Sequence, residues 1–173
     1  MNQSGNIDIL FEICCENEDQ AQQIMQWRND PTTLQHFYHH EPKVWETFWV
    51  EYCDEYLTGG PRPVFALQNG ERVAFLRFNT AAHPAGSAVD ISINVAPDAR
   101  GRGVGARVLL AVRDHLIKQG VVAIIAEVRQ ANTASLKAFR KAGYESQGLA
   151  DITVPDTGES VTVHRFVQFL GDQ

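Results

Sequence analysis

The sequence is poor in cysteine and offers no ligand set for a metal. Its three cysteines, Cys14, Cys15 and Cys53, form no Cys-x-x-Cys pair, and an odd number argues against a disulfide framework. The six histidines show no zinc spacing, and the adjacent His39 and His40 are the only tempting pair. Adjacent side chains point in different directions in regular structure and chelate one ion poorly. We therefore expect no metal.

Long apolar runs and a basic excess are also missing. No run approaches the about 20 residues of a membrane helix, and the N-terminus lacks the pattern of a signal peptide. The formal net charge is −6, from 15 basic and 21 acidic residues. We therefore expect a cytoplasmic protein that binds neither membrane nor nucleic acid. An acidic surface weakly favours an amine substrate, although it also serves solubility alone.

Patterns along the chain predict one mixed α/β domain over residues 1–173. Apolar alternation and short apolar runs predict strands at 7–14, 64–67, 73–78, 89–95, 121–128, 152–154 and 161–169. Apolar spacings of three and four predict helices over 17–29, 44–57, 103–118 and 132–143. This order contains one crossover in its second half and lacks the repeated βαβ units of a dinucleotide fold.

The most informative stretch follows the predicted strand 89–95. It contains Arg100-Gly-Arg-Gly-Val-Gly105, and a helix begins at once. Glycines allow a close backbone approach, and a helix N-terminus supplies free N–H groups and partial positive charge, so the turn suits a pyrophosphate. No Gly-Lys-Ser/Thr follows, and the glycine spacing differs from Gly-x-Gly-x-x-Gly. A turn that only caps a helix is the alternative.

Two blocks resemble the Gcn5-related N-acetyltransferase (GNAT) superfamily. Residues 100–105 are similar to its Arg/Gln-x-x-Gly-x-Gly/Ala motif, and residues 132–144 are similar to its Asn-x-x-Ala/Ser-x-x-x-Tyr-x-Lys-x-Gly-Phe segment. The resemblance implies a CoA-binding core at about 89–145. It also implies a mixed central sheet of about six to seven strands flanked by about four helices. The implied activity is transfer of an acetyl group from acetyl-CoA, as co-substrate, to a primary amine.

The same resemblance assigns residues to acetyl-CoA. Backbone amides of 100–106 should hold the pyrophosphate, and the main chain of Val95 should hold the pantetheine arm where strands 89–95 and 121–128 splay. Asn132 should contact the arm or only cap its helix. The predicted cofactor-binding residues are Val95, Arg100, Gly101, Arg102, Gly103, Val104, Gly105, Ala106, Asn132 and Phe139.

In this family the amine attacks the thioester directly, which requires a base and a proton donor. Asp90 is the first candidate base, because it lies in a polar row on a strand expected to be central; Glu127, inside an apolar strand, is the second. Phe139 stands where the family often has a proton-donating tyrosine, and it packs either on the acetyl arm or in the core. The donor is then water or another tyrosine, with Tyr38, Tyr52 and Tyr144 as candidates.

The acceptor should be set by about residues 17–65. Trp27-Arg-Asn-Asp-Pro31 resembles a subset that acetylates nucleotide-linked amino sugars, polyamines or ribosomal protein N-termini. Because Arg28, Arg62 and Arg77 suit a nucleotide diphosphate, we favour a small-molecule acceptor of the nucleotide-linked amino-sugar type. Polyamines and protein N-termini stay alternatives, as do a non-catalytic acetyl-CoA-binding regulatory module and an unrelated phosphate-binding protein. A homodimer is also left open, with 161–169 as a candidate edge strand.

Overall fold

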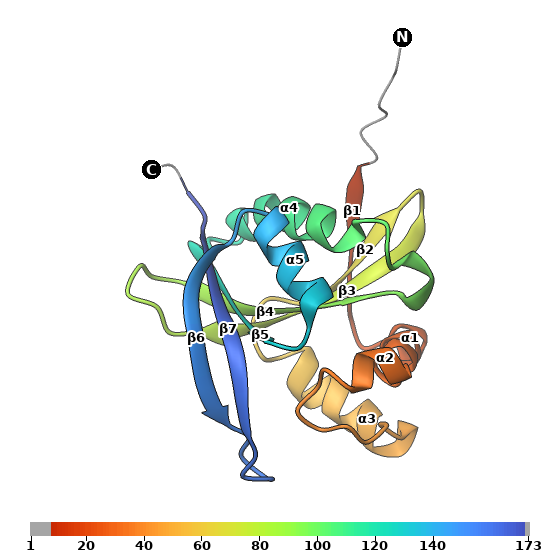
Figure 1. The fold of residues 1–173 in the computed structure, drawn as a ribbon. Coiled ribbons are helices and arrows are strands. Elements are labelled where there is room, and N and C mark those ends of the chain that lie inside the picture. The colour runs from red at the N-terminus through yellow and green to blue at the C-terminus, as the bar shows by residue number, and fades with distance from the viewer. Residues whose placement is uncertain (1–7, 172–173) are drawn as a thin grey trace.

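A single seven-stranded sheet organises residues 8–171, the part of the chain that the computed structural model describes. Its strand order is β1-β2-β3-β4-β5-β7-β6 (Figure 1). The strands are β1 (Ile9–Ile13), β2 (Val64–Gln68), β3 (Glu71–Ala81), β4 (Ala88–Val95), β5 (Ala123–Arg129), β6 (Glu145–Thr153) and β7 (Ser160–Phe169). The predicted mixed α/β architecture is confirmed, and Ile7 of the first predicted strand lies outside the described residues.

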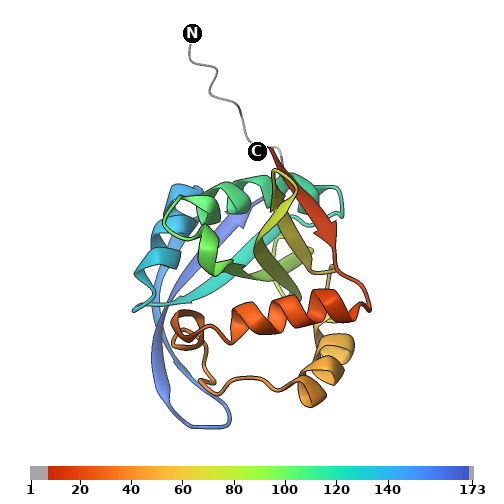
Figure 2. The same ribbon diagram turned by 90° about the vertical axis from the view of Figure 1, so that its right-hand side faces the viewer.

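Helices cover both faces of this sheet. They are α1 (Glu18–Arg28), α2 (Pro31–Leu34), α3 (Trp45–Glu51), α4 (Val104–Ile117) and α5 (Thr133–Lys141), with a π-helical turn at Tyr52–Tyr56 continuing α3. Helices α4 and α5 lie on one side of the sheet, and α1, α2 and α3 lie on the other (Figure 1). The perpendicular view in Figure 2 shows the same separation of α4 from α1. No helix within residues 8–171 is long and apolar enough to cross a membrane.

The centre of the sheet contains its one parallel pair, β4 with β5; the other pairs of neighbouring strands are antiparallel. The parallel ladder covers only three residue pairs, from Ala88 opposite Ala123 to Asp90 opposite Ile125. Beyond Asp90 the two strands pair only with their outer neighbours, β3 and β7. The sheet is therefore open along residues 91–95, as the predicted splay requires.

Local sequence explains the elements that were predicted well. Asn69 and Gly70 both have positive φ, 53° and 79°, which is the geometry of a two-residue hairpin turn between β2 and β3. The side chain of Asn17 accepts a hydrogen bond from Gln20 N at 3.0 Å and caps α1. Asn17 and Gln20 have the sequence spacing of a capping box, but the box does not close, because the side chain of Gln20 instead accepts from Cys15 N at 2.9 Å.

Two local predictions differ from the structure, and one short helix was not predicted. Helix α1 ends at Arg28 as expected, but α2 follows at once: the Asp30 side chain caps it and Pro31 occupies its first turn, where the missing N–H costs nothing. Strand β6 begins at Glu145, well before the predicted 152. The prediction that strand 161–169 lies at an edge of the sheet is wrong, because β7 lies between β5 and β6 and both of its sides are hydrogen-bonded.

The alternation of β4 separates a core face from a polar face. Val89 and Ile91 are buried, and they belong to the core cluster that includes Val108, Val112 and Leu116 of α4. Successive strand residues point to opposite faces, so Asp90, Ser92 and Asn94 turn to the side of α1 and α2. The polar row predicted from the sequence thus lies on the face opposite α4, where it lines a cleft.

Candidate active site

A cleft of about 690 Å³ opens where β4 and β5 part. One wall consists of the glycine loop 100–105 and helix α5, and the opposite wall consists of α1, α2 and the middle of β3. Both candidate bases, Asp90 and Glu127, line this cleft. Of the predicted cofactor-binding residues, Arg102 alone is not among the residues that line it.

The backbone of the glycine loop has the shape of an anion cradle. Gly101 and Gly103 have φ of +76° and +71°, and Gly103 precedes the 14-residue helix α4 as an N-cap without a side-chain hydrogen bond. A Cβ on Gly101 would meet nothing within 4 Å, so a ligand can reach the backbone there. The uncapped N–H groups and the helix dipole fit a pyrophosphate.

Gly105 serves packing. A Cβ on this residue would lie 3.3 Å from Ala138 Cβ of α5 and 3.6 Å from Val95 Cγ2 of β4. The first turn of α4 can therefore lie directly against α5 and the end of β4. This close approach keeps the start of α4 beside the open end of the parallel pair.

Both arginines of the glycine loop, Arg100 and Arg102, are hydrogen-bonded to other groups of the protein, so they do not simply add free charge to the loop. Arg100 Nη1 bonds Asp30 Oδ2 at 2.8 Å, and its Nη2 donates to Thr33 Oγ1 at 2.6 Å. That hydrogen bond lowers the pKa of the Asp30 carboxyl, so the pair is ionised at neutral pH. Arg102 is exposed, and its guanidinium donates to the carbonyl of Asp98. Their roles toward the pyrophosphate stay predictions.

Further cationic side chains lie near the glycine loop, and the sequence analysis did not assign them to the site. Lys137 and Lys141 of α5 line the cleft. A Cβ on Gly103 would lie 3.8 Å from Lys141 Nζ and 3.7 Å from Arg107 Nη1. The sequence does contain a signal for the two lysines: their i, i+4 spacing places them on one side of a short helix.

Asn132 and Phe139 each combine the two roles that were left open. Asn132 Oδ1 accepts from Ser135 N at 3.2 Å and caps α5, and the residue also lines the cleft. Phe139 is 2% exposed and stacks on Phe166 at 5.5 Å between ring centroids, yet it too borders the cleft. Each residue therefore has a structural role and also borders the cleft.

The electrostatics of the cleft distinguish the two candidate bases. Burial, and then the charge of Glu127, raise the pKa of the Asp90 carboxyl to about 6. Glu127 is exposed, and its Oε1 lies 3.4 Å from Arg165 Nε of β7. A carboxyl group that titrates near neutral pH exchanges protons more readily, which favours Asp90.

Among the three candidate proton donors, only Tyr38 lines the cleft. Tyr52 is buried and its hydroxyl donates to the carbonyl of Cys15 at 2.7 Å. The hydroxyl of Tyr144 is buried without a hydrogen-bond partner in the described structure. Burial, followed by the charge of Glu127, raises the pKa of the Tyr38 phenol, which keeps it protonated at neutral pH.

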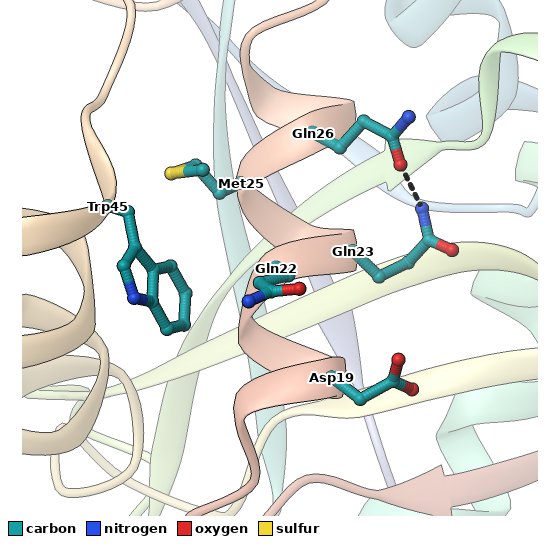
Figure 3. Close-up of a pocket in the computed structure, with 6 residues that line it drawn as sticks. All are labelled: Asp19, Gln22, Gln23, Met25, Gln26 and Trp45. Atoms are coloured by element: carbon teal, nitrogen blue, oxygen red, sulfur yellow. Dashed lines mark hydrogen bonds between the residues drawn. The ribbon is translucent and has the colours of Figure 1, made fainter.

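A second, shallower pocket lies between α1 and the start of α3 (Figure 3). Five residues of α1, Met25 among them, line it together with Trp45, and Gln23 Nε2 donates to Gln26 Oε1 at 3.1 Å. It shares no lining residue with the cleft, and Asp19 is its only carboxylate. Over residues 8–171 no group of three or more His, Cys, Asp or Glu is placed to hold a metal.

A glycine loop at a helix N-terminus, a splayed parallel pair of strands and a half-buried carboxyl group where the strands part agree with the site that the sequence resemblance to a CoA-dependent acetyltransferase implies. Residues 21–144 match the model of the acetyltransferase (GNAT) family, and the chain belongs to that family. It is an acetyl-CoA-dependent N-acetyltransferase by class. A sequence search of curated proteins finds no match.

Solved structures of acetyltransferases share the fold. The aminoglycoside acetyltransferase AAC(6')-Ib with ribostamycin and coenzyme A is 20% identical, with a TM-score of 0.75 over 94% of this chain and 93% of that chain. A putative phosphinothricin N-acetyltransferase is 20% identical, with a TM-score of 0.74 over 95% and 100%. A putative acetyltransferase from Salmonella typhimurium with acetyl-CoA is 16% identical, with a TM-score of 0.71 over 95% of each chain.

Proposed function

We propose that this enzyme acetylates the primary amine of a small molecule by direct attack, with Asp90 as the base. The observation that carries the proposal is the position of Asp90 at the last residue pair before β4 and β5 separate, with a pKa raised to about 6. Acetyl-CoA supplies the activated acyl group. The protein has to bind it, orient the amine and receive the proton that the amine loses.

Binding falls to the glycine loop and the open edge of β4. The amides of 101–106 hold the pyrophosphate, supported by the charges of Lys137 and Lys141. Residues 91–95 have no partner from β5 in the described structure, so their free backbone groups bond the pantetheine arm and the developing oxyanion, with Val95 as the predicted contact. Asp90 accepts the amine proton directly or through one water.

We further propose that Tyr38 gives a proton to the departing thiolate in place of the missing tyrosine at Phe139. Arg129 Nη1 of β5 donates to the carbonyl of Phe37 at 3.1 Å, which holds the neighbouring Tyr38 beside the cleft. The Tyr38→Phe variant should lower kcat by about 10- to 100-fold, a modest loss because a thiol with a pKa near 8.5 is a tolerable leaving group.

Steady-state thiol release checks this prediction, with Tyr52→Phe as the control. Tyr52 loses a buried hydrogen bond to Cys15, so its variant should be less stable by about 1 kcal/mol but unchanged in kcat. Equal kcat values for wild type and Tyr38→Phe would assign the proton to water.

For the acceptor, a nucleotide-linked amino sugar is the first candidate. Arg28 and Arg77 line the cleft, whereas Arg62 is exposed and does not. Two cationic side chains in the wall weigh against a polyamine, which carries only positive charge. A protein N-terminus and a non-catalytic acetyl-CoA-binding module stay alternatives, although the raised pKa of Asp90 is typical of a working acid or base.

Thiol release from acetyl-CoA across a panel of amines tests the function. The panel contains nucleotide-linked amino sugars, polyamines, aminoglycosides and N-terminal peptides. We expect release with one class, accompanied by the acetylated amine in equal amount. Acetyl-CoA binding without release for any amine would support the non-catalytic module. Competition by free phosphate or nucleotides as strong as that by CoA would support the unrelated phosphate-binding protein.

A further inference from the structure

We propose that the acceptor carries a carboxylate or phosphate group near its amine, and that Arg28 and Arg77 bind this anion. The inference rests on the proposed acetyl transfer and names the class of amine that the cleft takes. Its basis is a pair of guanidinium groups in the cleft wall that form no ion pair with a carboxylate within residues 8–171, and each of which has one buried nitrogen, Arg28 Nη1 or Arg77 Nε, without a hydrogen-bond partner there.

Arg28 is buried to an extent that an unpaired arginine seldom is. It is the last residue of α1 and is 7% exposed, its guanidinium lies 4.4 Å from the centroid of the Phe37 ring, and it lines the cleft. Its Nη1 is buried with no hydrogen-bond partner in the described structure. Burial of an unpaired charge is unfavourable, and a ligand anion removes that cost.

Arg77, in the middle of β3, repeats the pattern. Its guanidinium lies 3.8 Å from the centroid of the Tyr56 ring, and its buried Nε also has no partner in the described structure. Burial raises the pKa of the Tyr56 phenol, and the charges of both Arg77 and Arg28 oppose that rise. Both guanidinium groups therefore act on one tyrosine that lines the cleft.

Four other arginines of this chain show what a paired guanidinium looks like here. Each lies within 2.6 to 3.9 Å of a carboxylate oxygen; they are Arg72, Arg100, Arg129 and Arg165. Arg28 and Arg77 have no such carboxylate within residues 8–171, although both border the cleft. Two arginines without a carboxylate partner border the cleft in which we propose that the acceptor binds. Their position indicates that the acceptor supplies the negative charge.

The sheet register relates this anion subsite to the base. Arg77 lies opposite Ser92, and the next pair on the same face is Asn79 opposite Asp90. Diagonal neighbours of this kind are about 7 Å apart. An acceptor that joins an amine to an anion through a few bonds can therefore reach Asp90 and Arg77 together. Amino acids and amino-sugar phosphates, free or nucleotide-linked, have this chemistry, whereas polyamines lack it.

Matched ligand pairs test the subsite without turnover. Lysine differs from cadaverine only by its carboxylate, and glucosamine 6-phosphate differs from glucosamine only by its phosphate. Calorimetric titration into the full chain saturated with coenzyme A, which has no acetyl group to transfer, gives each affinity. We expect the anionic member of at least one pair to bind 10-fold or more tightly than its partner. The pair that responds identifies a carboxylate or a phosphate.

Variants then assign the preference to these arginines. Arg28→Lys, which keeps the charge, and Arg77→Gln should each reduce the preference at least 10-fold, whereas Arg62→Gln, at an exposed arginine outside the cleft, should retain it. Unchanged affinity for coenzyme A shows that each variant is folded. Equal affinity within both pairs, including no binding by either anionic member, would overturn the proposal, as would a preference that survives both cleft variants. Thiol release with the same ligands tests acetyl transfer separately.

Discussion

Replacing Asp90 with asparagine should lower kcat for acetyl transfer by about 100- to 10,000-fold and leave the affinity for acetyl-CoA unchanged. Asparagine keeps the size and the polarity of the side chain but cannot accept a proton. Asp90 stands where β4 and β5 part, whereas the glycine loop proposed to hold the pyrophosphate follows the far end of β4. Single-turnover thiol release and equilibrium acetyl-CoA binding separate the two effects.

The pH dependence of the wild-type activity is a second test of Asp90 as the base. A base works when it is deprotonated, and burial together with the charge of Glu127 raises the pKa of Asp90 to about 6. Activity should therefore rise as the pH increases through 6, and this acid limb should be absent from the residual activity of Asp90→Asn. A limb that persists in the variant would assign it to another group.

Stability measurements control for loss of the fold. The folded-state pKa of Asp90 is about 6 against an ordinary 3.8, so the folded state binds its proton more tightly than the unfolded state does. That contribution is complete below pH 3.8 and is lost as the pH rises through 6. A neutral asparagine avoids this loss. The variant should be more stable than wild type at pH 7 by on the order of 1 to 2 kcal/mol, allowing for partial exposure.

Glu127→Gln is the comparison variant for both experiments. It removes the second cause of the raised pKa of Asp90, so the acid limb should move below pH 6 while most of kcat remains. Because Glu127 is exposed and faces Arg165, its replacement leaves no buried group unpaired. A loss of kcat as large as that of Asp90→Asn would make Glu127 the base instead.

Tryptophan at Gly103 should weaken acetyl-CoA binding by about 100-fold or more. The first side-chain atom would already lie 3.7 Å from Arg107 Nη1 and 3.8 Å from Lys141 Nζ, so the indole would occupy the space in which these cations meet the phosphates. The φ of +71° adds backbone strain of about 1 to 2 kcal/mol for any side chain. Calorimetric titration with acetyl-CoA measures the loss.

Gly158→Trp separates strain from obstruction. Gly158 has a φ of +67°, a Cβ there would meet nothing within 4 Å, and the residue lies in the turn between β6 and β7, away from the cleft. The two variants should lose similar thermal stability, but Gly158→Trp should bind acetyl-CoA like wild type. Equal affinities for both would remove the glycine loop from the binding site.

The parts of this structure that depend on local chemistry could be predicted from the sequence. The Asn69-Gly70 turn, the Asn17 cap and the glycine loop before α4 are each specified by a few neighbouring residues. The alternation of β4 also placed Asp90 on a polar face correctly. These signals carry the fold and the CoA-binding half of the site.

The parts that depend on tertiary contacts could not be predicted. Strand β6 is mostly exposed, so its early residues show no apolar alternation, and pairing with β7 makes it a strand. The proposed anion subsite joins Arg28 of α1 to Arg77 of β3, 49 positions away, and only the fold brings both to Tyr56. The capture of Arg100 by Asp30 is of the same kind. A cytoplasmic location stays a prediction.

The bond between Arg100 and helix α2 connects two walls of the cleft. Arg100 belongs to the glycine loop that we propose holds the pyrophosphate, and its guanidinium holds Asp30 and Thr33, the latter in the opposite wall. A displacement of this side chain by one substrate would be transmitted to the wall that faces the other. Linkage is reciprocal: any factor by which acetyl-CoA strengthens acceptor binding is the factor by which the acceptor strengthens acetyl-CoA binding. Any such coupling should therefore depend on Arg100 as well as on the two binding pockets.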